Sequence, residues 1–265
     1  MSVGYCTVVV KYSHKVVERL RLERGARTQT RLGILSHDEV AAKEYGVPVK
    51  IHSGEVVILP MTPERWIESI EHRTQVLYRT DVAMIIYMAE IRAGHTVVES
   101  GAGTLGLTYA LSRTVGEKGR VFTFEVNRKR CEEGAKEIAE NMDNVVIAER
   151  DVVKDGFGLE ARADAVILDL PTPHEVVREA DRVLAAGGVF VAFVPCIEQV
   201  QSLLKKIAEA GSFESPRLFE TVEIPHRMRS LRRNSERVYG TAPEKITRGH
   251  TGYIVLAHKG PGMYY

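Results

Sequence analysis

The sequence predicts an α/β protein in which a doubly wound sheet follows a small N-terminal β domain. From about residue 95 onward, apolar strand candidates alternate with helix candidates, as in parallel sheets that helices cover on both faces. A glycine-rich turn at 101–106 joins the first of these strands to a helix. Residues 1–61 instead contain short β-branched segments broken by Gly, Pro and charged residues, which is typical of small β domains.

The first domain is expected to end at residue 61, where the character of the sequence changes. Thr62 and Pro63 are typical of a helix start, with Thr as N-cap and Pro in the first turn. A second helix is predicted over 81–91, where apolar residues recur at helical spacing. Residues 62–265 therefore form the second, larger domain. In the first domain, strands are predicted at 7–12, 48–53 and 55–60.

The larger domain should alternate strands and helices almost to its end. Strands are predicted at 95–100, 120–126, 144–150, 164–170 and 188–194. Helices are predicted at 105–115, 128–141, 174–184 and 198–210. A last strand at 253–258 follows an arginine-rich segment, 227–248, which we interpret as a loop.

Composition excludes several classes of protein. The 36 basic and 35 acidic residues leave a net charge of +1, so overall charge neither indicates nucleic-acid binding nor excludes a local basic patch. Cys6, Cys131 and Cys196 form no CxxC pair and no plausible zinc set, which favours a reducing compartment and no metal site. No apolar run is long enough to span a bilayer, and no secretory signal is visible. We expect a soluble intracellular protein without a membrane contact.

The glycine-rich turn is the first candidate binding site. Gly101, Gly103 and Gly106 match the dinucleotide-binding pattern GxGxxG, and Glu125 follows at about the spacing of a ribose ligand. Glycines allow close approach of a ligand, and the helix start favours a negative group. That group is either a pyrophosphate or the carboxylate of a methionine moiety, while a tight turn without a ligand is the plain alternative.

Acidic residues near three strand ends distinguish these ligands. Glu99 is expected at the mouth of the turn, where it would repel a pyrophosphate but suit an ammonium and a sulfonium. Glu125 and Asp151 follow the next two strands and can accept hydrogen bonds from ribose hydroxyls and an adenine amino group. Each acid alone could be a solvated strand end, but the set favours S-adenosylmethionine over NAD.

Asp169 is the candidate catalytic residue because it ends the next apolar strand at the same sheet edge. A carboxylate there can act as a general base, or it can stabilise positive charge that develops on a ring nitrogen. The alternative is a helix N-cap or turn aspartate, since Pro171 and Pro173 follow closely.

Seven segments fit a single family pattern. They are RGARTQTRLGIL (24–35), HRTQVLYRTD (72–81), VVESGAGTLG (97–106), FTFEVNRKR (122–130), AVILDLPTP (165–173), FVPCIEQVQ (193–201) and GHTGYIVLA (249–257). From about residue 24 to 258, the chain thereby resembles the catalytic subunit of eukaryotic tRNA (adenine-58-N1)-methyltransferase. The resemblance implies a class I (Rossmann-like) methyltransferase fold, with S-adenosyl-L-methionine as methyl donor and S-adenosyl-L-homocysteine as product.

The resemblance also implies a reaction and a cofactor site. The methyl group would go to N1 of adenine 58 in the T-loop of tRNA, and Asp169 would accept the N6 proton so that N1 presents its lone pair. One departure is Leu105, which replaces a usual glycine and adds bulk beside the methionine part of the cofactor. The expected cofactor site comprises Gln75, Leu77, Glu99, Gly101, Gly103, Thr104, Leu105, Glu125, Arg130, Asp151, Val152 and Asp169.

Contacts to tRNA are expected from two segments by the same resemblance, namely Arg27, Gln29, Thr30, Arg31, Tyr78 and Arg79. Without the resemblance, residues 24–31 would be an ordinary solvated turn. The arginines of the 227–248 segment either face RNA or are simply exposed.

Partners and location are likewise implied by the family alone. A non-catalytic paralogous subunit would complete a nuclear heterotetramer, and the chain alone would form a homo-oligomer that methylates tRNA poorly. Two other functions remain as alternatives: a nicotinamide-dependent dehydrogenase, and a non-catalytic tRNA-binding scaffold on a methyltransferase fold.

Overall fold

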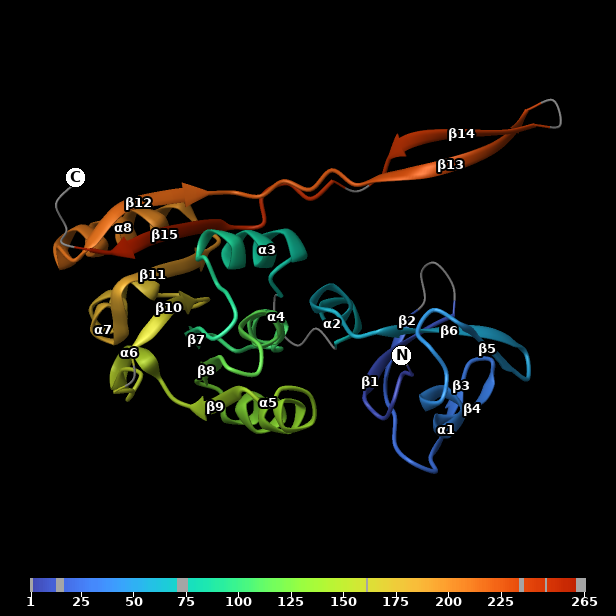
Figure 1. The fold of residues 1–265 in the computed structure, drawn as a ribbon. Helices are drawn as coiled ribbons and strands as arrows, with labels where there is room; N and C mark the ends of the chain where they lie inside the picture. The colour runs from blue at the N-terminus through green and yellow to red at the C-terminus, as the bar shows by residue number, and fades with distance from the viewer. Residues whose placement is uncertain are drawn as a thin grey trace.

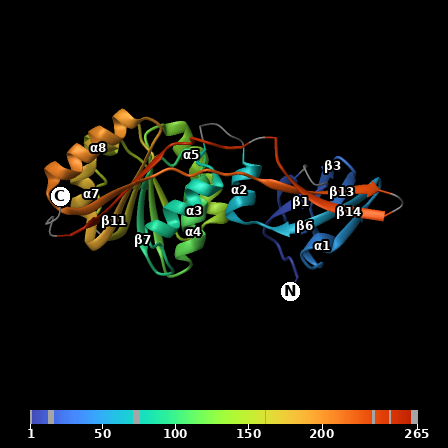
Figure 2. The ribbon, with the colours of Figure 1, turned by 90° about the horizontal axis from the view of Figure 1, so that it is seen from above.

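The computed structural model describes residues 2–12, 17–70, 76–160, 162–233, 236–245 and 247–260. A large α/β unit and a smaller N-terminal β unit lie side by side, and a long two-stranded hairpin projects from the large unit above the small one (Figures 1 and 2). None of the described helices is both long and apolar enough to cross a membrane.

The N-terminal unit is an antiparallel sheet in the order β2-β1-β6-β5, with a separate β3–β4 hairpin. The predicted strands β1, β5 and β6 are confirmed, whereas β2, the β3–β4 hairpin and helix α1 were not predicted. The RTQTR segment is thus mostly strand rather than a solvated turn. The elements are β1 (Thr7–Lys11), β2 (Val17–Arg21), β3 (Arg27–Thr30), β4 (Gly33–Ser36), α1 (His37–Ala41), β5 (Pro48–Ile51) and β6 (Gly54–Pro60).

A seven-stranded sheet forms the centre of the large unit, in the order β12-β15-β11-β10-β7-β8-β9. Neighbours from β11 to β9 in this order pair in parallel, while β15 pairs antiparallel with both β11 and β12. The strands are β7 (Thr96–Ser100), β8 (Arg120–Glu125), β9 (Val145–Glu149), β10 (Ala163–Leu168), β11 (Leu184–Val194), β12 (Phe213–Phe219) and β15 (Tyr253–Lys259).

Helices cover both faces of this sheet, which confirms the doubly wound prediction. Successive residues of a strand point to opposite faces of the sheet, so both faces are apolar and need a cover. Val97 and Ile167 pack with α3, α4 and α5, whereas Val98 and Val166 pack with α7 and α8. The helices are α2 (Pro63–Ser69), α3 (Arg79–Met88), α4 (Gly106–Val115), α5 (Arg128–Asn141), α6 (Val152–Asp155), the 3-10 turn η1 (Pro173–Glu175), α7 (Val177–Val183) and α8 (Ile197–Ala210).

The prediction of a loop for the arginine-rich segment, 227–248, is wrong. Most of the segment forms a β-hairpin. Strand β13 (His226–Arg233) pairs antiparallel with β14 (Glu236–Pro243) in continuous register. The many charged residues of this hairpin hid its strand pattern. In the described part of the chain neither of its faces packs on a core, so alternating apolar residues are not required.

Aromatic and charged side chains join the N-terminal sheet to the large unit. The Arg19 guanidinium lies 4.6 Å from the centroid of the Trp66 ring, and Arg19 also donates two hydrogen bonds to Glu137 on α5, at 2.7 and 3.0 Å. Trp66 stacks on Tyr109 of α4, with 4.3 Å between ring centroids. These contacts place β2 beside α2 and α5, close to the glycine-rich turn.

Candidate active site

The carboxyl ends of β7, β8 and β10 meet where the strand order reverses, which is the place for ligands in an open α/β sheet. A pocket of about 400 Å³ opens there and contains Leu77, Gly101, Gly103, Glu125, Arg130 and Asp169. An adjoining pocket of about 410 Å³ shares four of these residues and adds Asp151 and Val152. The structure thus brings together eight predicted site residues from distant segments, while Gln75 lies outside the described residues.

Backbone geometry at the turn requires glycine. Gly101 has φ +98, and a Cβ there would collide with the carbonyl oxygen of Asp169. The Asp169 amide in turn donates to the carbonyl of Ser100 at 2.9 Å. The end of β10 therefore packs directly against the end of β7, and only a residue without a side chain fits between them.

Leu105 occupies the left-handed region, at φ +63, as the N-cap of α4. A leucine there is strained by about 1 kcal/mol relative to glycine. Its side chain is buried in the core on the α5 side, near Gly134, and it does not line the pocket that contains Asp169. The burial offsets the strain. Leu105 also lines a neighbouring pocket of about 510 Å³ with Gly103, Thr104 and Arg130, so its expected place beside the cofactor stays a prediction.

Glu125 is held in place by three donors. Its Oε1 accepts from the Asn127 amide at 2.9 Å and from Arg130 at 2.7 Å, and its Oε2 accepts from the Gly103 amide at 3.1 Å. The side chain is 4% exposed. A carboxylate has about four acceptor positions, so one remains for a hydroxyl group of a ligand, and the same residue also supports the glycine-rich turn.

Asp151 combines a place in the pocket with a structural role. It is the N-cap of α6 and accepts from the Val153 and Lys154 amides. A hydrogen bond from the Lys154 side chain lowers the pKa of the Asp151 carboxyl. The cap fixes the carboxylate at the pocket wall, beside Val152.

Glu99, which we expected at the mouth of the turn, is buried. It is 1% exposed, and its Oε2 accepts a hydrogen bond from the Thr108 hydroxyl on α4 at 2.7 Å. It borders a small cavity of about 30 Å³ with Leu77, Gly101, Thr104 and Asp169. Burial raises the pKa of Glu99 to about 7.

Asp169 presents a half-buried carboxyl group to the pocket, among Leu170, Pro171 and Phe193. Burial raises its pKa to about 6. No described residue donates a hydrogen bond to this carboxyl group, and the N-cap of η1 is Thr172, not Asp169. The helix-cap alternative is therefore wrong, and the carboxylate is free to accept a proton or a hydrogen bond from a ligand.

The expected tRNA contacts fall into two separate places. Arg27, Gln29 and Arg31 are exposed on the β3–β4 hairpin of the N-terminal unit, where Arg31 pairs with Glu18 at 2.8 Å. Thr30 is buried, and its hydroxyl donates to the Gly33 carbonyl at 2.6 Å. It therefore closes the hairpin.

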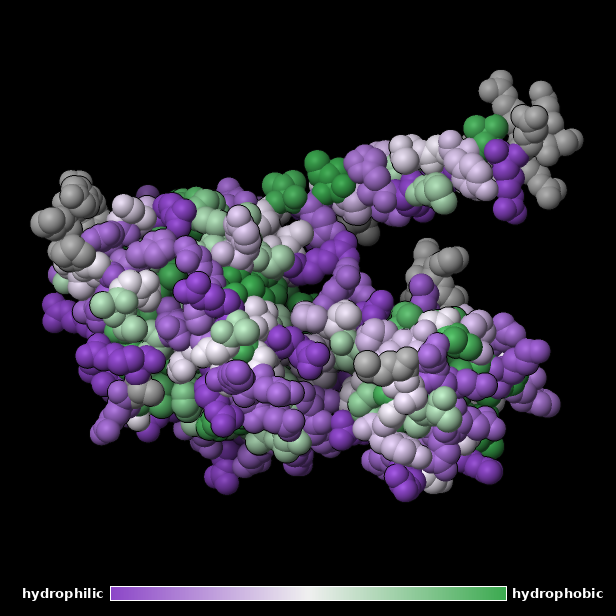
Figure 3. Space-filling view, in the orientation of Figure 1, coloured by the Kyte–Doolittle hydropathy of each residue, from purple (hydrophilic) through white to green (hydrophobic). Residues whose placement is uncertain are grey.

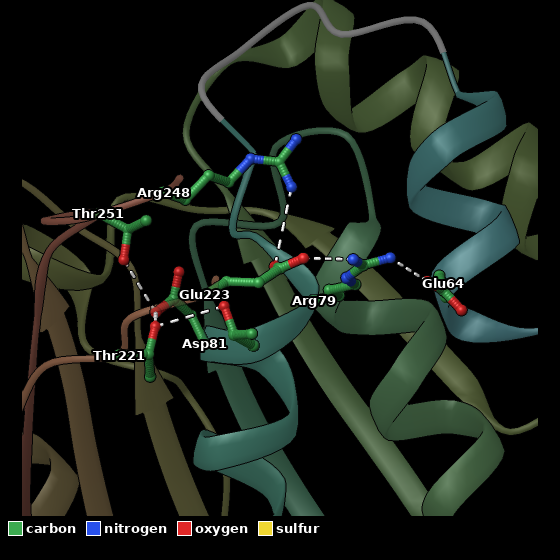
Figure 4. Close-up of polar contacts among 8 residues, drawn as sticks. Glu64, Arg79, Asp81, Thr221, Glu223, Arg248 and Thr251 are labelled. Atoms are coloured by element: carbon green, nitrogen blue, oxygen red, sulfur yellow. Dashed lines mark hydrogen bonds and ion pairs between the residues drawn. The ribbon is translucent and has the colours of Figure 1, made fainter. Parts of the chain in front are cut away.

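Tyr78 and Arg79 lie in the large unit instead. Tyr78 lines the pocket with Asp169. Arg79 forms ion pairs with both Glu64 and Glu223 (Figure 4). Its charge is thus already balanced within the protein.

Asp81 is a pocket residue that the sequence analysis missed. It is fully buried at the start of α3, and its Oδ1 accepts from the hydroxyls of Thr221 at 2.5 Å and Thr251 at 3.0 Å (Figure 4). Its Oδ2 has no partner among the described residues. Its position near a helix start concealed it, although it ends the HRTQVLYRTD segment that the resemblance used. Pro195 and Gln199, also in the pocket wall, lie in the FVPCIEQVQ segment of the same resemblance.

No group of three or more His, Cys, Asp or Glu side chains in the described part of the chain is arranged to hold a metal ion.

Comparison with known proteins gives consistent results. A family described as tRNA methyltransferase complex GCD14 subunit matches residues 54–238. A catalytic subunit of tRNA (adenine(58)-N(1))-methyltransferase, TRM61 of Candida albicans, is 33% identical over 266 residues, covering 96% of this chain and 78% of the relative. The protein of the same description from Dictyostelium discoideum is 34% identical, covering 77% of this chain and 67% of the relative.

Solved structures show the same fold. The tRNA (m1A58) methyltransferase TrmI from Aquifex aeolicus has a TM-score of 0.72 and 23% identity, covering 97% of each chain. A SAM-dependent O-methyltransferase from Thermotoga maritima has a TM-score of 0.77 and 24% identity, covering 97% of this chain and 94% of that one.

Proposed function

The chain belongs to the family of tRNA methyltransferase complex GCD14 subunits, and from this premise we propose that it transfers a methyl group from S-adenosyl-L-methionine to N1 of adenine 58 in the T-loop of tRNA. The observation that supports this most directly is the free carboxylate of Asp169 beside the glycine-rich turn. Mass spectrometry of tRNA nucleosides after incubation with the protein and the methyl donor tests it, because 1-methyladenosine should appear at position 58.

The residues at the turn fit a ligand that carries a ribose and an amino acid. Gly101 leaves room that a Cβ would fill, Glu125 keeps an acceptor position, and Glu99 faces the small cavity below the turn. We propose that Glu125 binds the ribose hydroxyls, that Asp151 and Val152 border the adenine ring, and that Glu99 faces the ammonium group. The bound donor supplies an electrophilic methyl group on a sulfonium.

Asp169 then acts on the target base. N1 of adenine carries a lone pair and needs no deprotonation before attack, so catalysis depends on alignment and on stabilising the cation that forms. Asp169 accepts a hydrogen bond from the N6 amino group, which turns N1 toward the methyl group. The target base must leave its stack to reach this pocket, as in other base-modifying enzymes. Tyr78, at the pocket wall, is placed to stack on it.

A dehydrogenase and a non-catalytic scaffold are the competing functions. Calorimetric titration separates the first, since S-adenosylhomocysteine should bind and NAD should not. A scaffold would bind the cofactor without turnover, so the nucleoside assay separates the second.

Glu125→Gln should weaken S-adenosylhomocysteine binding by roughly 10-fold, because a neutral amide replaces a charged acceptor. The matched control is Glu149→Gln, since Glu149 is paired with Glu125 on the neighbouring strand but is exposed and outside both pockets. Calorimetry on the two variants measures the difference. Equal affinities would remove Glu125 from the site.

We further propose that the chain assembles in the nucleus with a non-catalytic paralogous subunit into a heterotetramer. A two-stranded hairpin is only marginally stable alone, yet β13–β14 projects from the molecule (Figure 1). Apolar and aromatic side chains are exposed along it and the segment before it: Val222, Ile224, Met228, Val238 and Tyr239. Figure 3 shows green patches along the projecting hairpin and the segment that leads to it. Such a surface supports an interface between subunits. We also propose a domain boundary between residues 61 and 62, with a β domain before it and a methyltransferase domain after it.

The chain alone should therefore methylate tRNA poorly, and addition of the paralogous subunit should restore turnover. Light scattering gives the oligomeric state of each sample, and the nucleoside assay gives its activity. Strong methylation by the single subunit would contradict the need for a partner.

A further inference from the structure

A second charged pocket lies at the root of the hairpin, separate from the one that contains Asp169. It has a volume of about 510 Å³, and its charged lining consists of Arg79, Arg227, Lys245, Arg248, Glu223 and Glu244. The four cations exceed the two carboxylates, and they still exceed them by one when Glu64, which pairs with Arg79 from outside, is counted. Although the chain as a whole is nearly neutral, this pocket therefore carries a net positive charge.

The arginines of this pocket differ in how closely carboxylates pair with them. Arg79 is saturated by Glu64 and Glu223 (Figure 4). Arg248 and Arg227 instead lie 3.8 Å from Glu223 and 3.7 Å from Glu244, beyond hydrogen-bond distance. Their guanidinium groups therefore keep donors available for another acceptor.

Arg227 gives the sharpest indication of a ligand. Its Nε is buried and has no hydrogen-bond partner in the described structure. A buried donor without an acceptor destabilises a protein, so such a group indicates a missing acceptor. An anionic oxygen in the pocket would satisfy Nε, and the guanidinium geometry suits phosphate.

The pocket is linked to the active site through Arg248 and Tyr78. The Arg248 guanidinium lies 4.6 Å from the centroid of the Tyr78 ring, and Tyr78 lines the pocket with Asp169. Glu223 pairs with Arg248 through backbone hydrogen bonds of 3.0 and 3.1 Å, which join the two chain segments at the root of the hairpin. An anion held here would sit next to the residue that we expect to stack on the target base.

We propose that this pocket binds a backbone phosphate of the RNA next to the target adenosine, with Arg227 and Arg248 as its main donors. The proposal rests on the proposed function, since it assigns the RNA a second point of attachment. A phosphate fixed at the hairpin root and a base fixed against Asp169 would together orient the flipped nucleotide. Phosphate contacts generally set register and orientation in this way.

The test compares two arginines of the same strand. Arg227→Gln removes a pocket donor, and Arg229→Gln makes the same charge change two residues away, where the arginine is exposed and outside the pocket. Both variants are measured in the full chain, together with the paralogous subunit if activity requires it. For Arg227→Gln we expect a roughly 10-fold weaker tRNA affinity and a salt-dependence slope smaller by about 1. For Arg229→Gln both quantities should stay near wild type, and neither variant should change S-adenosylhomocysteine binding.

Three outcomes would overturn the proposal. Equal tRNA affinities in the two variants would show that the pocket holds no phosphate of the RNA. If inorganic phosphate binding depended on Arg227 while tRNA binding did not, the site would serve a free anion. If Arg227→Gln released the partner subunit with tRNA affinity intact, the pocket would belong to an interface. Failure of the wild-type protein to methylate tRNA even with the paralogous subunit present would instead contradict the proposed function, so the two failures are distinguishable.

Discussion

Asp169→Asn should lower methyl transfer to tRNA by roughly 10²- to 10⁴-fold and leave S-adenosylhomocysteine binding nearly unchanged. The carboxylate is the acceptor that would orient the amino group of the target base, and an amide presents donors as well as an acceptor there. Single-turnover methylation measures the loss, and calorimetry measures cofactor binding. Near-normal turnover in the variant would show that Asp169 is not catalytic.

The pH dependence of the wild-type enzyme follows from the same carboxyl group. Burial raises the pKa of Asp169 to about 6. Below that pH the group is protonated and loses the negative charge that strengthens its hydrogen bond from N6 and stabilises the cationic product. The methylation rate should rise with pH through about 6 and level off above 7. Asp169→Asn should lack this limb. Because the pKa of Glu99 is about 7, Glu99→Gln is the necessary control, and it should keep the limb near pH 6.

Stability distinguishes a catalytic aspartate from a structural one. The pKa of Asp169 is raised from 3.8 to about 6 on folding, so ionisation opposes the folded state; the cost is absent below pH 4 and complete above about pH 6. At 1.36 kcal/mol per pKa unit, ionisation of Asp169 would lower the free energy of unfolding by about 3 kcal/mol. This is an upper bound, because solvent screens the half-buried side chain. Asp169→Asn should therefore raise the melting temperature at pH 8 but not at pH 4. A cap or structural residue would show the opposite change at pH 8.

The central sheet and most of its ligand edge could be predicted from sequence because each depends on local patterns. Apolar runs that end in Glu125 and Asp169 specify buried parallel strands and also place their acids at one sheet edge. Thr62 was predicted as an N-cap, and its hydroxyl accepts the Arg65 amide at 3.3 Å.

The burial of Glu99, the role of Asp81 and the β13–β14 hairpin could not be predicted, because they depend on tertiary contacts that local sequence patterns do not reveal. The burial of Glu99 goes together with its hydrogen bond from Thr108 on the next helix. The role of Asp81 arises from Thr221 and Thr251, which are at least 140 residues away in sequence. The β13–β14 hairpin carries no apolar alternation because it covers none of the cores formed by the described residues.

Gly101→Ala should abolish measurable S-adenosylhomocysteine binding and destabilise the large unit. The backbone of Gly101 has φ +98, and an added Cβ would overlap the carbonyl oxygen of Asp169. Because that atom belongs to the backbone, it cannot turn away as a flexible side chain would. The ends of β7 and β10 must separate, which displaces both the turn and the catalytic carboxyl group.

Gly94→Ala is the matched control for this substitution. Gly94 has φ +89, and a Cβ there would meet no atom within 4 Å. Both variants pay the same backbone penalty of about 1–2 kcal/mol for an alanine at positive φ, but only Gly101→Ala also introduces the collision. Calorimetry should find cofactor binding in Gly94→Ala alone, and thermal unfolding should show the larger loss of stability in Gly101→Ala. If Gly101→Ala bound the cofactor with wild-type affinity, the two strand ends would not form the binding site, and the assignment of Asp169 to that site would fail with it.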